Sequence, residues 1–166
     1  VTTEIDKLQK HLIPIKKILT DTKYNYLIIQ SNNDIGSEKI KSLYKELNGK
    51  PNIRILPSMR FEYYLSALKN ANLIIGNSSS GVRESSYFGV PSINIGNRQK
   101  GRSDAKNITN CEFDLIQIKK AIDENLNKKF KSIKKFGSGE SGLKFKKVLL
   151  STKFWNTSIQ KSFVEI

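Results

Sequence analysis

A short apolar run that ends in a glycine-flanked, serine-rich stretch is the feature that most constrains how this chain can fold. Residues 73–75 are typical of a buried strand, and residues 76–81 have the small polar composition of a tight turn. A helix is predicted over residues 80–88, and the apolar residues 92–95 predict another strand. Strand, turn, helix and strand in this order predict two parallel strands joined by a crossover helix, the repeating unit of an α/β fold.

The rest of the chain extends the same alternation. Pro14 allows a split of the first helix into two pieces, with the proline as first residue of the second. The short apolar strands between helices predict an α/β, Rossmann-like fold with a mostly parallel sheet and helices on both faces. Further strands are expected at residues 24–30 and 53–56, and amphipathic helices at residues 4–20, 37–48, 61–70, 114–127 and 143–150.

Length and cysteine usage limit the class of protein. The 166 residues fit one α/β domain, no apolar run is long enough to cross a bilayer, and the polar first residues do not resemble a signal peptide. The missing initiator Met suggests a fragment or a processed product. The one cysteine, Cys111, rules out an internal disulfide and suits a reducing cytoplasm. We interpret it as a semi-buried packing residue, and His11 as a solvated helix residue.

The net charge of +14, from 29 basic and 15 acidic residues, raises the possibility of a nucleic-acid-binding module. The lysines are scattered along the predicted helices, and the aromatic residues do not alternate with them as a stacking platform requires. The charge therefore favours an anionic ligand in general, and nucleic-acid binding stays the least favoured of three hypotheses.

The serine-rich turn has the features of a phosphate site. Backbone N–H groups at a helix start are unpaired and lie at the positive end of the helix dipole, so they attract a phosphate or diphosphate. The carboxylate of Glu84 would lie roughly 5 Å along the helix axis, within reach of the hydroxyls of an attached ribose. The basic loop at residues 96–102 follows the next strand, and ligands bind at such carboxyl ends of strands. The sequence therefore predicts a nucleotide-diphosphate site.

Two segments carry a family resemblance. Residues 77–84 (NSSSGVRE) and 88–102 (FGVPSINIGNRQKGR) resemble the C-terminal half of UDP-N-acetylglucosamine 2-epimerases. The Arg-Gln-Lys-Gly-Arg stretch at residues 98–102 is similar to the hydrolysing branch. Weaker matches at residues 1–4 and 136–139 extend the resemblance over nearly the whole chain.

The resemblance implies the second half of a GT-B-type architecture, two Rossmann-like domains with the sugar nucleotide between them. The chain would be a single UDP-binding domain over residues 1–166. The intact enzymes release UDP and N-acetylmannosamine for sialic-acid synthesis. Their N-terminal domain, and a histidine that would precede Val1, carry the chemistry, so no catalytic residue is assigned and the isolated chain is expected to be inactive. The family further implies a cytoplasmic homo-oligomer without cofactor, metal, membrane or nucleic-acid partner.

The resemblance also assigns the UDP half of the site, and each assignment has a structural alternative. The serines of the turn could be only a helix cap, Glu84 a solvated acid of the first turn, and Arg98 a surface cation. The nucleotide half of a GT-B glycosyltransferase would share these residues and is the second hypothesis. The implied contacts are Ser78 and Ser79 to the diphosphate, Glu84 to the ribose, Arg98 to the phosphates and the Met59 backbone to uracil, with Ser58 beside it and Ser80, Gly81 and Arg102 as further candidates.

Overall fold

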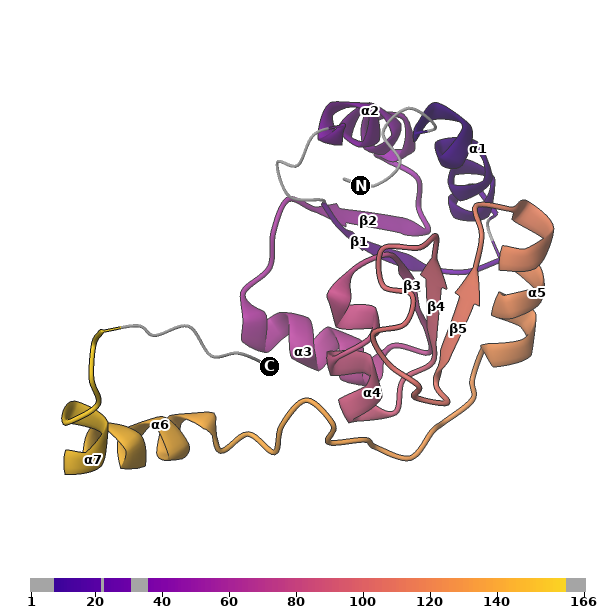
Figure 1. Ribbon diagram of the computed structural model, residues 1–166. Coiled ribbons are helices and arrows are strands. Elements are labelled where there is room, and N and C mark those ends of the chain that lie inside the picture. The colour runs from indigo at the N-terminus through magenta and orange to yellow at the C-terminus, as the bar shows by residue number, and fades with distance from the viewer. Residues whose placement is uncertain (1–7, 22, 31–35, 161–166) are drawn as a thin grey trace. The chain divides into compact units, whose positions relative to one another are not determined.

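The strands of the computed structural model, which describes residues 8–21, 23–30 and 36–160, pair only in parallel. Strands β1 (Tyr26–Ile29) and β2 (Ile53–Leu56) form one pair. Strands β3 (Ile74–Gly76), β4 (Ser92–Ile95) and β5 (Ile108–Cys111) form a second sheet in the order β3-β4-β5 (Figure 1). The parallel α/β class predicted from the sequence is confirmed, with the hydrogen-bonded pairs divided between two sheets.

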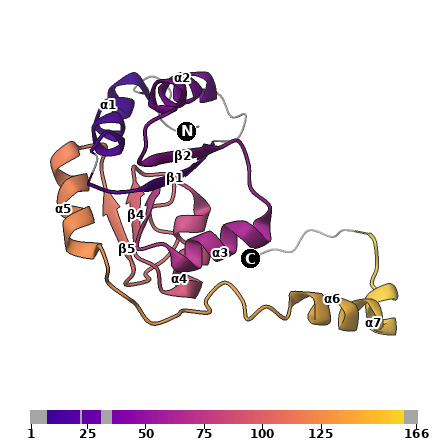
Figure 2. The same ribbon diagram turned by 180° about the vertical axis from the view of Figure 1, so that it is seen from behind.

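Helices lie on both sides of these strands. Figure 1 shows α1 and α2 on one side of the β1–β2 pair and α3 and α4 on the other, and Figure 2 shows the same order from behind. Helix α5 packs against α1, β4 and β5. The helices of this part of the chain are α1 (Leu8–Leu19), α2 (Ser37–Leu47), α3 (Phe61–Asn70), α4 (Glu84–Phe88) and α5 (Leu115–Asn125).

Two apolar clusters form the core. The first joins β4, β5, α1 and α5 through buried side chains such as Ile18, Ile93 and Ile118. Tyr26 of β1 packs against the edge of this cluster, so it links the two sheets although no hydrogen-bond ladder joins them. The second cluster packs α1 and α2 on β2. Cys111 lies in the first cluster and is 7% exposed, which confirms its interpretation as a packing residue.

Three elements differ from the sequence predictions. Pro14 lies inside a continuous α1, because its missing N–H removes one helix bond but leaves the packing of the helix intact. Strand β5 was not predicted, since its two central residues are polar and give no strand pattern. The helix expected over residues 80–88 is a 3-10 turn, Ser79–Gly81, followed by the short α4.

One single-residue interpretation is also wrong. His11 is half-buried, not solvated, and its ring stacks on the ring of Phe113 with centroids 4.0 Å apart.

Residues 134–166 form a second unit, separate from residues 1–133. It contains α6 (Ser141–Leu149) and α7 (Thr152–Trp155), and neither helix has a buried residue. The indole N–H of Trp155 donates to the carbonyl of Leu149 at 2.7 Å, which holds the two helices together. In the described residues, none of the helices has the length and hydropathy that crossing a bilayer requires.

The weak family match at residues 1–4 and the first residues of the helix predicted from residue 4 lie outside the described residues. The assignment of residues 1–166 to a single domain stays a prediction.

Candidate functional site

The predicted site residues follow the carboxyl ends of three parallel strands. Ser58 and Met59 follow β2, the serine turn (residues 78–81) follows β3, and the arginine loop (residues 96–102) follows β4. Strands β3 and β4 are paired neighbours, with Gly76 beside Asn94, so the serine turn and the arginine loop leave the same edge of one sheet. This is the edge at which parallel α/β sheets bind ligands.

The serine turn is a capped 3-10 turn. Ser78 is its N-cap, and the Ser78 hydroxyl accepts the N–H of Ser80 at 3.3 Å. The following N–H groups are also engaged, Gly81 with the carbonyl of Ser78, and Val82 and Arg83 with that of Ser79. The side chains of Ser78 and Ser79 are exposed. The turn therefore offers a ligand two exposed hydroxyls and one long hydrogen bond that an anion could replace.

Ser80 is tied to α3. The Tyr64 hydroxyl donates to Ser80 Oγ at 2.5 Å, across a part-buried contact between α3 and the turn. Burial raises the pKa of Tyr64, the bond to Ser80 lowers it and the nearby charge of Glu84 raises it further. Tyr64 thus stays protonated near neutral pH and acts as a donor.

Glu84 is half-buried and is the first residue of α4. The sequence placed it one turn inside a longer helix, and the break after Gly81 moves it to a helix start. An acid in the first turn is stabilised by the helix dipole, so this position alone has a structural explanation as well as a functional one.

A buried polar network centred on Asn107 holds α4 in place. Asn107 is 2% exposed, and its Nδ2 donates to Ser85 Oγ at 3.2 Å and to the Val90 carbonyl at 2.8 Å. Its Oδ1 accepts the hydroxyl of Ser86 at 3.0 Å. The Ser85 hydroxyl donates to the carbonyl of Gly81, and the one hydroxyl proton of Ser86 is shared between Asn107 Oδ1 and the carbonyl of Val82. Asn107 therefore fixes the segment that joins the serine turn to Glu84.

Gly81 has a packing reason to be glycine. A Cβ at this position would lie 2.8 Å from Ser92 Oγ, closer than a side chain tolerates. The close approach of the turn to β4 therefore accounts for Gly81 without any ligand.

The arginine loop is joined to the serine turn by one side chain. Gln99, 3% exposed, donates from Nε2 to the main-chain carbonyl of Asn77 at 3.1 Å. The loop also closes on itself through the N–H of Arg102, which donates to the Gln99 carbonyl at 3.2 Å. Arg98 is half-buried and Arg102 is exposed. Across the part of the chain that the structure describes, Arg98 makes no ion pair.

The uracil end of the predicted site lies on the segment between β2 and α3. Met59 is half-buried and Ser58 is exposed, and this segment runs directly into α3. Helix α3 carries Tyr64, whose hydroxyl reaches Ser80. The structure thus connects this segment to the serine turn through α3, while β2 itself belongs to the other sheet.

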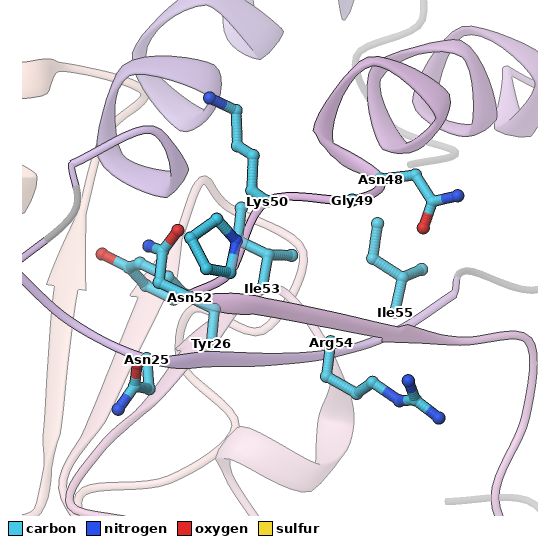
Figure 3. Close-up of a pocket in the computed structure, with 10 residues that line it drawn as sticks. Asn25, Tyr26, Asn48, Gly49, Lys50, Asn52, Ile53, Arg54 and Ile55 are labelled. Carbon is cyan, nitrogen blue, oxygen red and sulfur yellow. The ribbon is translucent and has the colours of Figure 1, made fainter.

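Two hollows among the described residues lie away from these segments. One of about 440 Å³ opens at the amino ends of β1 and β2. Figure 3 shows that its polar groups diverge: Asn25 and Arg54 lie on one side of the strands, Lys50 and Asn52 on the other. A second, of about 170 Å³, lies between α1 and α5. Polar groups that do not converge give a ligand no common point of attachment, so the first hollow does not replace the strand-end site. In the second hollow the polar side chains bind one another, Lys119 with Asp21 and Tyr24 with Asp123.

The structure brings Ser78–Gly81, Glu84 and Arg98 to adjacent segments and leaves Met59 and Ser58 connected only through α3. Sequence reasoning did not assign a role to Gln99, Tyr64 or Asn107. Gln99 lies inside the Arg98–Arg102 motif, but nothing in a sequence distinguishes a buried glutamine from an exposed one. The bond of Tyr64 to Ser80 depends on tertiary packing, which no local sequence pattern shows.

Comparisons with known proteins identify the family of this chain. The family model of UDP-N-acetylglucosamine 2-epimerase matches residues 2–150. A UDP-N-acetylglucosamine 2-epimerase of Neisseria meningitidis serogroup B is 36% identical over 171 residues, which span all of this chain and 45% of the relative. A UDP-N,N'-diacetylbacillosamine 2-epimerase (hydrolyzing) of Legionella pneumophila is 26% identical over 142 residues, 85% of this chain and 38% of the relative. The chain therefore spans less than half the length of these relatives.

The fold is also that of a solved relative. The crystal structure of Methanocaldococcus jannaschii UDP-GlcNAc 2-epimerase in complex with UDP-GlcNAc and UDP superposes with a TM-score of 0.66 at 23% identity, over 86% of this chain and 40% of that one. At this identity the likeness concerns the fold, and it supports the GT-B-type half predicted from the sequence. With the family model matching residues 2–150, we conclude that this chain belongs to the UDP-N-acetylglucosamine 2-epimerase family.

Proposed function

We propose that this chain is the UDP-binding domain of a hydrolysing UDP-N-acetylglucosamine 2-epimerase. The observation that carries the proposal is the bond from Gln99 to Asn77, which joins the residue after Arg98 to the residue before Ser78. It puts a guanidinium and two exposed serine hydroxyls on neighbouring segments, and a guanidinium fork with hydroxyl donors suits a diphosphate. The hydrolysing branch is supported by the Arg98–Arg102 motif and by the Legionella relative, which is named as a hydrolyzing 2-epimerase.

In this proposal Ser78, Ser79 and Arg98 hold the diphosphate, Glu84 accepts the ribose hydroxyls, and the backbone at Met59 meets the uracil. Ser58, Ser80, Gly81 and Arg102 border these contacts. The intact enzyme would remove the C2 proton of UDP-N-acetylglucosamine, expel UDP and add water to give N-acetylmannosamine, as in sialic-acid synthesis. Charge grows on the departing diphosphate oxygen, so donors aimed there stabilise the transition state more than the ground state.

The proposal leaves the proton chemistry to the remainder of the full-length enzyme. The chain of 166 residues is therefore expected to bind UDP and to turn nothing over. Its buried free thiol, Cys111, fits the cytoplasm that we propose as its location. Assembly into a homo-oligomer belongs to the same proposal.

Calorimetric titration with UDP tests the site. Arg98→Ala is expected to weaken UDP binding by about tenfold or more, because a charge-assisted bond to phosphate is lost. Glu124→Gln on α5 serves as the control and is expected to bind UDP as the unaltered chain does. Equal binding by Arg98→Ala and the control would remove Arg98 from the site.

A second titration tests the role of Glu84. Removing the ribose 2′-hydroxyl is expected to weaken binding to the unaltered chain more than to Glu84→Gln, since the carboxylate accepts the paired hydroxyls. An equal loss in both proteins would argue against ribose recognition by this residue.

Product analysis with the full-length enzyme tests the reaction. UDP together with free N-acetylmannosamine is the expected result. UDP-N-acetylmannosamine would indicate the non-hydrolysing reaction, and a glycosylated acceptor would indicate a transferase. Release of UDP from UDP-N-acetylglucosamine by the 166-residue chain alone would contradict the assignment of the chemistry to the remainder of the enzyme.

A further inference from the structure

Burying the side-chain amide of Gln99 costs free energy that an apolar side chain at the same position would not cost. Gln99 is 3% exposed, and its Nε2 has a partner in the Asn77 carbonyl. Its Oε1 is also buried and, in the part of the chain that the structure describes, makes no hydrogen bond. An unpaired buried carbonyl is destabilising, and a methionine of similar shape would fill the same space without that cost. The amide must therefore supply something other than packing.

The position of the hydrogen bond between Gln99 and Asn77 indicates what the Gln99 amide supplies. The acceptor, Asn77, is 22 residues away in sequence and directly precedes Ser78, while Gln99 directly follows Arg98. The start of the arginine loop is held by the Gly96 N–H, which donates to the Cys111 carbonyl at 2.8 Å. Beyond it, in the described residues, Arg98 makes no ion pair, and the N–H groups of Lys100 and Arg102 donate to the nearby carbonyls of Asn97 and Gln99. Within the frame that the β3–β4 pair provides, the Gln99–Asn77 bond therefore ties the residue after Arg98 to the residue before the serine turn.

We propose that Gln99 is a positioning residue for the nucleotide site, which holds the arginine loop against the serine turn so that Arg98 and Ser78 engage the same diphosphate. This inference rests on the proposed UDP site. Gln99 itself touches no phosphate in this proposal, because its side chain is buried and one of its two amide N–H groups already donates to Asn77. Gln99 affects UDP affinity by positioning Arg98, so the effect of Gln99 should vanish when the Arg98 guanidinium is removed.

A double-mutant cycle on UDP affinity tests this dependence. Gln99→Met is expected to weaken UDP binding about three- to tenfold in the unaltered background and to have no further effect in an Arg98→Ala background. Thermal unfolding is measured in parallel, and Gln99→Met is expected to change the unfolding temperature little, because removal of the unpaired Gln99 carbonyl offsets the loss of the hydrogen bond to Asn77. Gln117→Met, at an exposed glutamine of α5, is the matched control and should leave UDP affinity unchanged.

The outcomes separate the inference from the function on which it rests. If Gln99→Met lowers affinity by the same factor with and without Arg98, the glutamine does not act through the arginine and the inference is wrong. Wild-type affinity in Gln99→Met would also overturn it. If the unaltered chain itself does not bind UDP, the proposed function fails and the inference with it. Should Gln99→Met not unfold cooperatively, Gln99→Asn replaces it in the cycle, since it keeps the amide but withdraws it by one methylene.

Discussion

Gly89 and Gly101 share a left-handed backbone but differ in what surrounds them. Gly89 has φ of 68° and Gly101 has φ of 77°, a region that disfavours any residue with a Cβ. A Cβ at Gly89 would lie 2.0 Å from the carbonyl oxygen of Phe130, whereas nothing lies within 4 Å of one at Gly101. At the scale of single residues, a comparison of Gly89 with Gly101 therefore distinguishes the cost of a left-handed backbone from the cost of a steric clash.

The same substitution at the two glycines should have unequal effects. Gly101→Ala is expected to lower the free energy of unfolding by about 1 kcal/mol, the cost of the left-handed backbone. Gly89→Ala is expected to lower it by about 3 kcal/mol, because the segment at Phe130 must also move. Urea unfolding of both variants measures the difference. Equal losses of unfolding free energy would show that the segment at Phe130 moves away from the new methyl group without an energetic cost.

Tyr26 is expected to make the free energy of unfolding fall as pH rises in the alkaline range. Its hydroxyl donates to the Ile18 carbonyl at 3.0 Å, and burial, with smaller effects of Asp21 and Tyr24, raises its pKa from 10.0 to about 12. Because the folded chain holds this proton more tightly, the resulting stability is fully present below pH 10 and is lost as pH rises from 10 towards 12. The side chain is only part-buried, so we expect a loss of about 1 kcal/mol.

Tyr26→Phe is expected to remove this part of the alkaline loss, at a cost of about 1 kcal/mol near neutral pH for the missing hydrogen bond. Tyr63→Phe, in which an exposed ring is changed, is the control and should keep the alkaline loss of the unaltered chain. Unfolding free energies between pH 8 and pH 11 check the comparison. An unchanged alkaline loss in Tyr26→Phe would exclude Tyr26 as its source.

At the scale of elements, the short helix α4 is stabilised from outside. With five residues it has too few internal bonds to be stable on its own, and it forms because Asn107 and the segment around Phe130 bind its ends. The N–H groups of Phe130 and Ile133 donate to the carbonyls of Gly89 and Ser86 at 3.0 and 2.9 Å. Glu84 is therefore positioned by tertiary contacts of α4, not by the helix itself.

Asn107→Leu should test this support. We expect the free energy of unfolding to fall by about 3 kcal/mol, because the change removes three hydrogen bonds and leaves buried partners unpaired. Asn72→Leu, at an exposed position after α3, is the control and should change stability by less than about 0.5 kcal/mol. Urea unfolding measures both. A small loss for Asn107→Leu would mean that water or a rearrangement satisfies the network.

At the scale of the whole molecule, the two units differ in how they are stabilised. Both apolar clusters lie within residues 1–133. In the second unit, α6 and α7 expose apolar side chains such as Leu143, Phe145 and Trp155, the last 68% exposed. Because apolar burial is the main source of stability, the first unit contains what is needed for a cooperative transition.

A chain that ends at Ile133 is expected to keep that transition. Its unfolding temperature should lie within about 4 °C of that of the full chain, the shift that corresponds to about 1 kcal/mol. Differential scanning calorimetry measures it, and far-ultraviolet circular dichroism should show a loss of helical signal from α6 and α7. Loss of the cooperative transition would mean that residues 134–166 are needed for folding.

The sequence by itself determined the parallel α/β class and the order of the strand ends at which we propose the site, because periodicity and turn chemistry are local properties of the chain. It also indicated the family, through the resemblance of residues 77–84 and 88–102. It did not determine strand β5, whose polar residues become a strand only through pairing with β4. It also did not determine that the helix after the serine turn is broken, or that Gln99 faces the carbonyl of Asn77. Those features depend on contacts between residues far apart in sequence, and only the folded chain brings such residues together.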